Sequence, residues 1–197
     1  MTNIAIVNTK GGVGKTTSAI YLAAAAAHRK HEVRVVDTDP QGTATTWMSF
    51  VQEENPEVKC ELIVANLATL SRLPSTGINI IDTPPGNPAI IDRAIAIADF
   101  VIVPTAPSLT ELGRVWETLE IVPVGTPVAV LLTQVNPQAV LSAQVRSALE
   151  EANHLVFPLN IPRREKFRQA FGTWPADDTR SLVGYDTIFE QVMEIVK

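Results

Sequence analysis

The sequence predicts an α/β protein with a doubly wound, mostly parallel sheet and helices on both faces. Short apolar runs alternate with helix-like stretches along the whole chain, an order that favours right-handed crossovers between parallel strands. A glycine-rich segment ending in a lysine and two threonines separates the first apolar run from the first helix-like stretch. Aspartates follow two later apolar runs. Because ligands of such sheets bind beyond the carboxyl ends of the strands, these residues form the candidate site.

The alternation predicts the elements in order. We expect strands at 4–7, 33–36, 62–64, 78–81, 100–103, 128–132 and 155–157, because these runs are short and apolar. We expect helices at 18–29, 43–51, 67–73, 89–98, 109–121, 139–152 and 185–196. The polar segment 172–178 is too short to divide domains. We therefore expect residues 1–197 to form a single domain.

Composition restricts the class of protein. The chain is 46% hydrophobic and 19% charged, as in ordinary globular domains, and its single cysteine, Cys60, cannot form an internal disulfide or a multi-cysteine metal site. No apolar stretch approaches the roughly 18 residues of a membrane span, and the glycine-rich segment begins too early to leave room for a signal peptide. We expect a cytoplasmic protein that does not bind membranes. The net charge of −5 leaves room only for a local nucleic-acid-binding patch.

The glycine-rich segment is predicted to bind phosphate. Gly11, Gly12 and Gly14 let the backbone turn its N–H groups toward phosphate oxygens, and the N-terminus of the next helix adds partial positive charge. Lys15 would reach the β- and γ-phosphates, and the hydroxyl of Thr16 would ligate Mg²⁺. This order of strand, loop, lysine, hydroxyl and helix indicates the P-loop NTPase fold, and a ligand-free glycine turn is the alternative. The predicted nucleotide-binding segment comprises Lys10, Gly11, Gly12, Val13, Gly14, Lys15, Thr16 and Thr17.

One departure from the strict phosphate-loop pattern is informative. The pattern requires a glycine five residues before Gly14, where this chain has Thr9, and a second lysine, Lys10, lies inside the loop. Residues 10–17 resemble the deviant Walker A motif of the ParA/MinD ATPases. The resemblance implies a homodimer that closes face to face on two ATP molecules. Lys10 of each chain would reach across to the other chain's phosphates, as an arginine finger does in trans.

The aspartates have candidate roles in metal binding and hydrolysis. Asp82, which follows the run 78–81, has the Walker B pattern and would orient Mg²⁺ directly or through water; a carboxylate that caps a turn is the alternative. Residues 37–42 resemble the family's switch I, and 82–86 resemble its Walker B and switch II region. The resemblance implies that Asp39 positions the attacking water and that Asp37 supports the water shell of the metal. A solvated Asp-Pro turn is the alternative for both. Lys10, Lys15 and Asp39 are thus the candidate catalytic residues.

The resemblance covers nearly the whole chain and extends to the base of the nucleotide. Polar residues after the runs 128–132 and 155–157 match the positions of the family's adenine pocket. Gln134, Asn136, Pro162 and Arg163 are the implied contacts, and polar residues that merely end buried strands are the alternative. The chain has no Asn-Lys-x-Asp set of the kind that reads guanine. We therefore expect ATP and Mg²⁺ as the cofactors.

One cluster of cations is dense in this acidic chain. Residues 163–168 hold four cations and one anion. In ParA proteins, basic residues of this region bind DNA without sequence preference when ATP holds the dimer together. The implied DNA contacts are Arg164, Lys166, Arg168 and Arg180, and a solvated helix face is the alternative. Where the family often has a further basic residue, after the tyrosine that opens the last helix, this chain has Asp186.

The resemblance implies a function and leaves others open. Only nine residues precede Lys10, as in the small plasmid ParA (ParF-like) proteins, which work with a separate centromere-binding, ParB-like partner that stimulates slow ATP hydrolysis. We expect a nucleoid-associated ATPase that segregates plasmid or chromosome cargo. A MinD-like membrane-cycling ATPase would need a basic amphipathic C-terminus, whereas 185–197 is mostly acidic. An iron-sulfur reductase would need more cysteines. A metabolic ligase of the dethiobiotin synthetase kind would need a substrate site.

Overall fold

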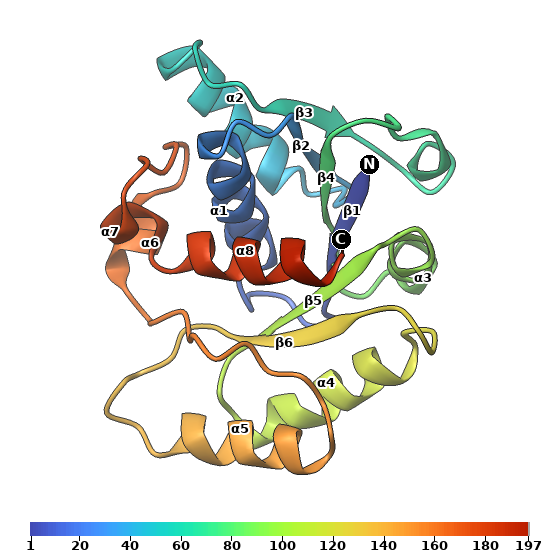
Figure 1. Ribbon diagram of the computed structural model, residues 1–197, viewed down its shortest axis with the longest axis vertical. Coiled ribbons are helices and arrows are strands. Elements are labelled where there is room, and N and C mark those ends of the chain that lie inside the picture. Colours follow the sequence, from blue (N-terminus) through green and yellow to red (C-terminus); the bar gives the residue numbers. More distant parts are fainter. Residues whose placement is uncertain (197) are drawn as a thin grey trace.

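Six strands form one parallel sheet in the computed structural model, which describes residues 1–196 apart from the side chains of Arg168 and Thr179. Their order across the sheet is β3-β2-β4-β1-β5-β6, and every pair of neighbouring strands is parallel (Figure 1). The predicted doubly wound α/β class is confirmed. The strands are β1 (Thr2–Ile6), β2 (Val33–Asp37), β3 (Glu61–Val64), β4 (Ile78–Asp82), β5 (Phe100–Thr105) and β6 (Val128–Leu132).

Helices follow the strands and cover the sheet. They are α1 (Lys15–His28), α2 (Thr43–Glu54), the 3₁₀ turn η1 (Leu70–Arg72), α3 (Pro88–Ala96), α4 (Leu109–Glu120), α5 (Leu141–Glu151), α6 (Glu165–Gln169), α7 (Thr179–Leu182) and α8 (Tyr185–Ile195). None of the helices in the described part has the length and apolar character that crossing a membrane requires.

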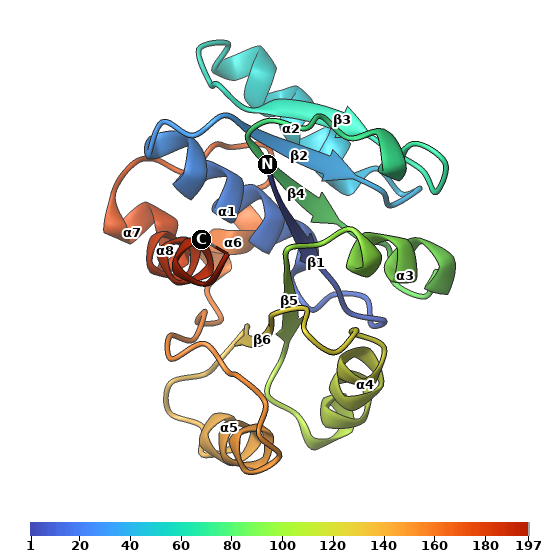
Figure 2. The ribbon, with the colours of Figure 1, turned by 45° about the vertical axis from the view of Figure 1, so that its right-hand side comes forward.

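The sheet is buried on both faces, which explains why its strands are continuous apolar runs. Alternate residues of β1 enter different cores: Ile4 and Ile6 pack with α1, α2 and α8, whereas Ala5 packs with α3, α4 and α5. Figure 2 shows α1 and α8 on one side of the sheet and α3 and α4 on the other. The hydrophobic core therefore has two layers.

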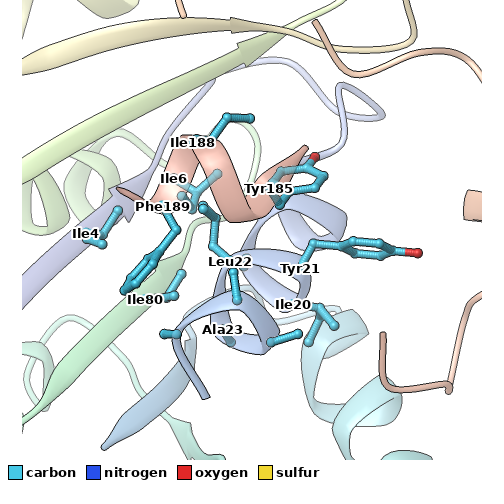
Figure 3. Packing of buried hydrophobic residues seen from close by; sticks show 14 of the residues in the cluster. Ile4, Ile6, Ile20, Tyr21, Leu22, Ala23, Ile80, Tyr185, Ile188 and Phe189 are labelled. Atoms are coloured by element: carbon cyan, nitrogen blue, oxygen red, sulfur yellow. The ribbon is translucent and has the colours of Figure 1, made fainter. Parts of the chain in front are cut away.

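Helix α1 is enclosed by the sheet and α8. Residues 18–26 are all buried. This stretch is mostly alanine, and its small side chains let α8 approach closely. Figure 1 shows α8 beside α1. Figure 3 shows Phe189 of α8 beside Ile4 and Ile80 of the sheet. Alanine also has the highest helix propensity. Burial on all sides fixes the N-terminus of α1, which is the end that carries the phosphate loop.

Several predicted elements differ from the structure. The expected strand at 155–157 was wrong: Val156 forms only an isolated bridge with Val130 of β6. The Phe157 N–H donates to Val130 of β6, but residues 158–160 leave the ladder, and pairing with β6 resumes only where Ile161 donates to Leu132. The expected helix at 67–73 is only the short turn η1. α6 and α7 went unpredicted, because segments of five and four residues are too short to show a helical period.

We predict that the α1–α8 contact contributes strongly to stability. Phe189 is 1% exposed, so Phe189→Ala should lower the free energy of unfolding by about 3–5 kcal/mol, through lost burial and the cavity left behind. Phe50→Ala removes the same atoms from a side chain that is 46% exposed and should cost much less. Urea unfolding followed by circular dichroism measures both. Equal losses in the two variants would contradict the central role of this contact.

Candidate nucleotide-binding site

The phosphate loop connects β1 to α1 at the carboxyl edge of the sheet. Gly14 precedes the first residue of α1 with a φ of 89°, and Gly12 has a φ of 77°. Side chains with a Cβ rarely adopt these left-handed angles, so glycine is required at both positions. The Gly14 carbonyl accepts the first intrahelical bond, from Ser18 at 2.8 Å. The free N–H groups at the start of α1 therefore lie directly behind the loop.

Two residues directly after β6 form side-chain hydrogen bonds with the backbone of the loop. The hydroxyl of Thr133 donates to the Val13 carbonyl at 2.8 Å, and the Gln134 side chain donates to the Gly12 carbonyl at 2.5 Å. Gln134 has a φ of 53°, a conformation that is uncommon for residues other than glycine and that is enriched at functional sites. Sequence reasoning missed Thr133, although its position directly after a predicted strand was a usable signal.

Lys15 folds back over the loop. Its side chain is largely buried, and Nζ donates to the Lys10 carbonyl at 2.7 Å. Burial lowers the pKa of Lys15, and the negative charges of Asp82 and Asp39 partly offset that effect. The ammonium is thus held beside the loop where phosphate oxygens would take over from the carbonyl.

Asp82, at the end of β4, is the most perturbed carboxyl of the site. The Thr16 hydroxyl donates to its Oδ2 at 2.6 Å, while its Oδ1 is buried and has no hydrogen-bond partner among the described residues. The pKa of Asp82 is raised to about 7, mainly by burial. The Thr16 hydrogen bond and the charge of Lys15 oppose this shift, whereas the charges of Asp37 and Asp39 add to it. A bound cation would satisfy the unpaired oxygen and stabilise the ionised form.

These two side chains suit Mg²⁺. A hydroxyl and a carboxylate oxygen are the hard ligands that Mg²⁺ prefers. Within the described residues no group of three His, Cys, Asp or Glu side chains converges as a metal site. Phosphate oxygens and water would therefore complete the coordination, as is usual for magnesium in nucleotide sites. Thr16 and Asp82 are the residues that would hold the ion.

The other two aspartates have different environments. The carboxylate of Asp37 is buried and accepts hydrogen bonds from the Asp39 backbone and from both the backbone and hydroxyl of Thr45. It pairs in register with Asp82 on the neighbouring strand. Asp39 is only partly buried and lines the cavity. Asp37 thus shapes the loop between β2 and α2, whereas Asp39 belongs to the cavity lining.

A cavity of about 440 Å³ opens beside the loop. It includes three of the four predicted base contacts, namely Gln134, Pro162 and Arg163. The fourth, Asn136, is absent from the described lining, and its side chain instead accepts from the Gln138 backbone in a local turn. The lining residues are Gly11, Gly12, Gly14, Lys15, Thr16, Thr17, Asp39, Thr43, Pro85, Thr133, Gln134, Ile161, Pro162, Arg163, Arg164, Phe167 and Tyr185.

Tyr185 connects this cavity to the C-terminal helix. It lines the cavity, and its hydroxyl lies 2.8 Å from the Ser18 hydroxyl in α1. Its ring lies 5.3 Å from that of Tyr21, which in turn meets Phe167 of α6. The phosphate-loop helix, α6 and α8 therefore share one aromatic contact. The sequence did not reveal it, because the residues are far apart in the chain.

The predicted DNA-binding cations fall into two groups. Arg164 lines the nucleotide cavity, beside the predicted base contact Arg163. Lys166 and Arg180 are exposed, and Nζ of Lys166 donates to the Arg180 carbonyl at 2.7 Å, which ties α6 to α7. The side chain of Arg168 lies outside the described part of the structure. The basic segment is thus continuous with the nucleotide cavity.

Lys10 does not point into its own cavity. Its side chain is 49% exposed, and its ammonium pairs with the carboxylate of Glu111 in the first turn of α4. Neither residue belongs to the described cavity lining. The two lysines of the loop therefore differ: Lys15 belongs to the cavity lining, and Lys10 lies outside it.

Comparison with known proteins identifies the family. The model of the CobQ/CobB/MinD/ParA nucleotide-binding domain matches residues 4–173. The chain belongs to this family. Its members include ATPases of the ParA and MinD type.

Two relatives and two solved structures show the breadth of the family. The maintenance of carboxysome distribution protein A of Gloeobacter kilaueensis is 34% identical over 85% of this chain and 76% of its own length. The chromosome-partitioning ATPase Soj of Thermus thermophilus is 29% identical over 98% of this chain and 96% of its own length. The fold also matches a complex of Cyanothece McdA with ATP, with a TM-score of 0.78, 21% identity and coverage of 100% and 96%. The structure of pNOB8 ParA bound to nonspecific DNA matches with a TM-score of 0.66 and 15% identity, and the match covers 99% of this chain and 96% of that one. The P-loop fold predicted from the sequence is confirmed.

We predict that Lys15→Ala abolishes nucleotide binding. The substitution removes the buried ammonium that would meet the β- and γ-phosphates. Equilibrium titration with a fluorescent ATP analogue should show a loss of at least about 100-fold, the equivalent of about 2.7 kcal/mol. Lys59→Ala, at an exposed lysine outside the cavity, is the control and should bind as the wild type does. Wild-type affinity in the Lys15→Ala protein would contradict the role of the loop.

Proposed function

We propose that this chain is an ATP-dependent positioning ATPase of the ParA kind, in which ATP holds two protomers together and the pair binds DNA without sequence preference. Slow hydrolysis, stimulated by a ParB-like adaptor, releases the DNA, so that repeated cycles move a cargo over the nucleoid. The cargo is a plasmid or chromosome, or a protein compartment such as the one named in the relative from Gloeobacter.

The position of Lys10 carries the proposal. A second lysine in a phosphate loop that points out of its own cavity is available to a nucleotide held by another protomer. A positive charge supplied in trans stabilises the charge that develops on the transferred phosphoryl group. Hydrolysis would then require pairing, and this requirement couples ATP turnover to a change of oligomeric state.

The residues of one protomer have separable roles within this scheme. The loop N–H groups and Lys15 would bind the β- and γ-phosphates. Thr16 and Asp82 would hold Mg²⁺, which when bound bridges phosphate oxygens and neutralises their charge. Asp39, partly buried and facing the cavity, would orient the attacking water. Tyr185, Pro162 and Arg163 would contact the base and sugar.

The exposed cations support the DNA-binding part of the proposal. Lys166 and Arg180 lie on linked short helices next to the cavity, so nucleotide-driven pairing would double the patch. The structurally similar pNOB8 ParA was solved on nonspecific DNA. Phosphate contacts of this kind provide affinity without sequence information.

We predict that Asp39→Ala separates binding from turnover. The carboxylate would act on the water and contributes little to holding the nucleotide, so ATP binding should persist while hydrolysis falls by about 100-fold. The ATP-bound dimer should accumulate. Gel filtration with ATP and a phosphate-release assay measure both effects. Asp92→Ala, at an exposed aspartate of α3, is the control. Hydrolysis at the wild-type rate in Asp39→Ala would exclude the role.

We predict that DNA binding requires ATP and the cations at positions 166, 168 and 180. A variant with Lys166→Gln, Arg168→Gln and Arg180→Gln should weaken binding about equally on any duplex. Each lost phosphate contact should reduce the slope of log affinity against log salt by about 0.9. Gel shifts with ATP, ADP and several salt concentrations measure this.

The matched control removes the same charge elsewhere. Lys59→Gln, Arg72→Gln and Arg114→Gln also neutralise three cations, and these three are exposed and lie outside the basic segment. This variant should keep the wild-type salt slope. Arg163 and Arg164 are left unchanged in both, because they line the nucleotide cavity. Equal slopes in the two triple variants would place the DNA-binding face elsewhere, and binding to anionic liposomes instead of DNA would favour a membrane-cycling ATPase.

A further inference from the structure

We propose that Glu111 is a positioning residue for Lys10: it holds the Lys10 ammonium on its own protomer until ATP-driven pairing withdraws it. This inference rests on the proposed function, since it assumes that Lys10 acts on the partner's nucleotide. It adds a residue that the phosphate-loop, switch and Walker B motifs do not contain.

Glu111 is a buried carboxylate with a single cationic partner. Its side chain is only 8% exposed, and one of its oxygens accepts from Nζ of Lys10. The other oxygen is buried and has no hydrogen-bond partner among the described residues. The first turn of α4 supplies partial positive charge, and no other described cation forms a salt bridge with Glu111. Because a buried charge is costly to leave unpaired, Glu111 restrains Lys10 strongly.

Lys10 is restrained at both ends. Its backbone N–H donates to the Asn8 side chain at 2.9 Å, and its carbonyl accepts from Lys15. The side chain ends at Glu111, outside the described cavity lining. ATP can therefore enter the cavity without disturbing the Lys10–Glu111 pair. Only a competing anion on the outer side of the loop, such as the triphosphate bound to a second protomer, would draw Lys10 away.

The pair would thus set a threshold for dimerisation. Lys10 is half exposed, which leaves its ammonium accessible to a more highly charged partner. Pairing of protomers must supply the free energy of breaking the Lys10–Glu111 contact, so dimers would form only when ATP is bound on both sides. Removing the charge of Glu111 while keeping its shape should lower that threshold.

We predict that Glu111→Gln dimerises more readily. With a non-hydrolysable ATP analogue, the dimer dissociation constant should fall about tenfold, which corresponds to about 1.4 kcal/mol. Glu117→Gln is the matched control, because Glu117 lies on the same helix and forms an exposed pair with Arg114. Exposed pairs contribute only about 0–1 kcal/mol, so the control should remain close to the wild type. Analytical ultracentrifugation gives both constants.

Carbodiimide crosslinking provides a second measurement that uses the wild-type protein. The reagent activates the Glu111 carboxylate, the Lys10 amine displaces the urea, and an amide bond joins the two side chains. Mass spectrometry should find this link within monomers of the nucleotide-free protein and a clear loss of it in the ATP-analogue dimer. This readout does not depend on how any variant folds.

Distinct results would overturn the inference and the proposed function. Absence of the Lys10–Glu111 crosslink in nucleotide-free monomers would overturn the inference, as would its full persistence in the dimer. So would a Glu111→Gln protein that binds the analogue but dimerises no better than the wild type. A wild-type protein that stays monomeric with the analogue would overturn the proposed function itself.

Discussion

The burial of α1 between the sheet and α8 is the constraint on which the site depends. The phosphate loop contains glycines, which allow many backbone conformations. Its geometry is set because β1 is central in the sheet and because residues 18–26 are buried on every side. Both ends of the loop are therefore immobilised by packing. Thr133 and Gln134, which follow β6, then donate hydrogen bonds to the carbonyls in the middle of the loop.

Electrostatics gives this rigid frame its chemistry. Asp37 and Asp82 are in register on adjacent strands, and Asp39 follows Asp37 by two residues, so negative charge gathers where the sheet ends. Asp37 accepts hydrogen bonds from its own loop, whereas Asp82 keeps one buried oxygen without a partner among the described residues. The protein thus distinguishes a carboxylate that shapes the backbone from one suited to a cation. A ligand that satisfies the unpaired Asp82 oxygen must bring positive charge.

The two lysines of the loop show how small differences in position separate roles. Lys15 is buried in the cavity lining, and burial lowers its pKa, while Lys10 pairs with Glu111 outside that lining. The aromatic contact that Tyr185 makes at the nucleotide cavity reaches α6. A nucleotide that presses on Tyr185 would therefore act on the same helix that carries Lys166. This arrangement provides a short physical path between the nucleotide and the basic segment.

Local patterns in the sequence were sufficient for the fold class, the phosphate loop and six of the seven expected strands, because a buried parallel strand must be an apolar run and a loop around phosphate must contain glycines. The 155–157 segment failed because the chain leaves β6 after a single bridge at Val156, which apolar character does not reveal. Only the tertiary structure decided which distant residues meet: it paired Lys10 with Glu111, 101 positions away, and placed Arg164 in the nucleotide cavity. No local pattern specifies such contacts, because they depend on how the strand order and the packing of α1 against α8 bring separate segments to the same edge of the sheet.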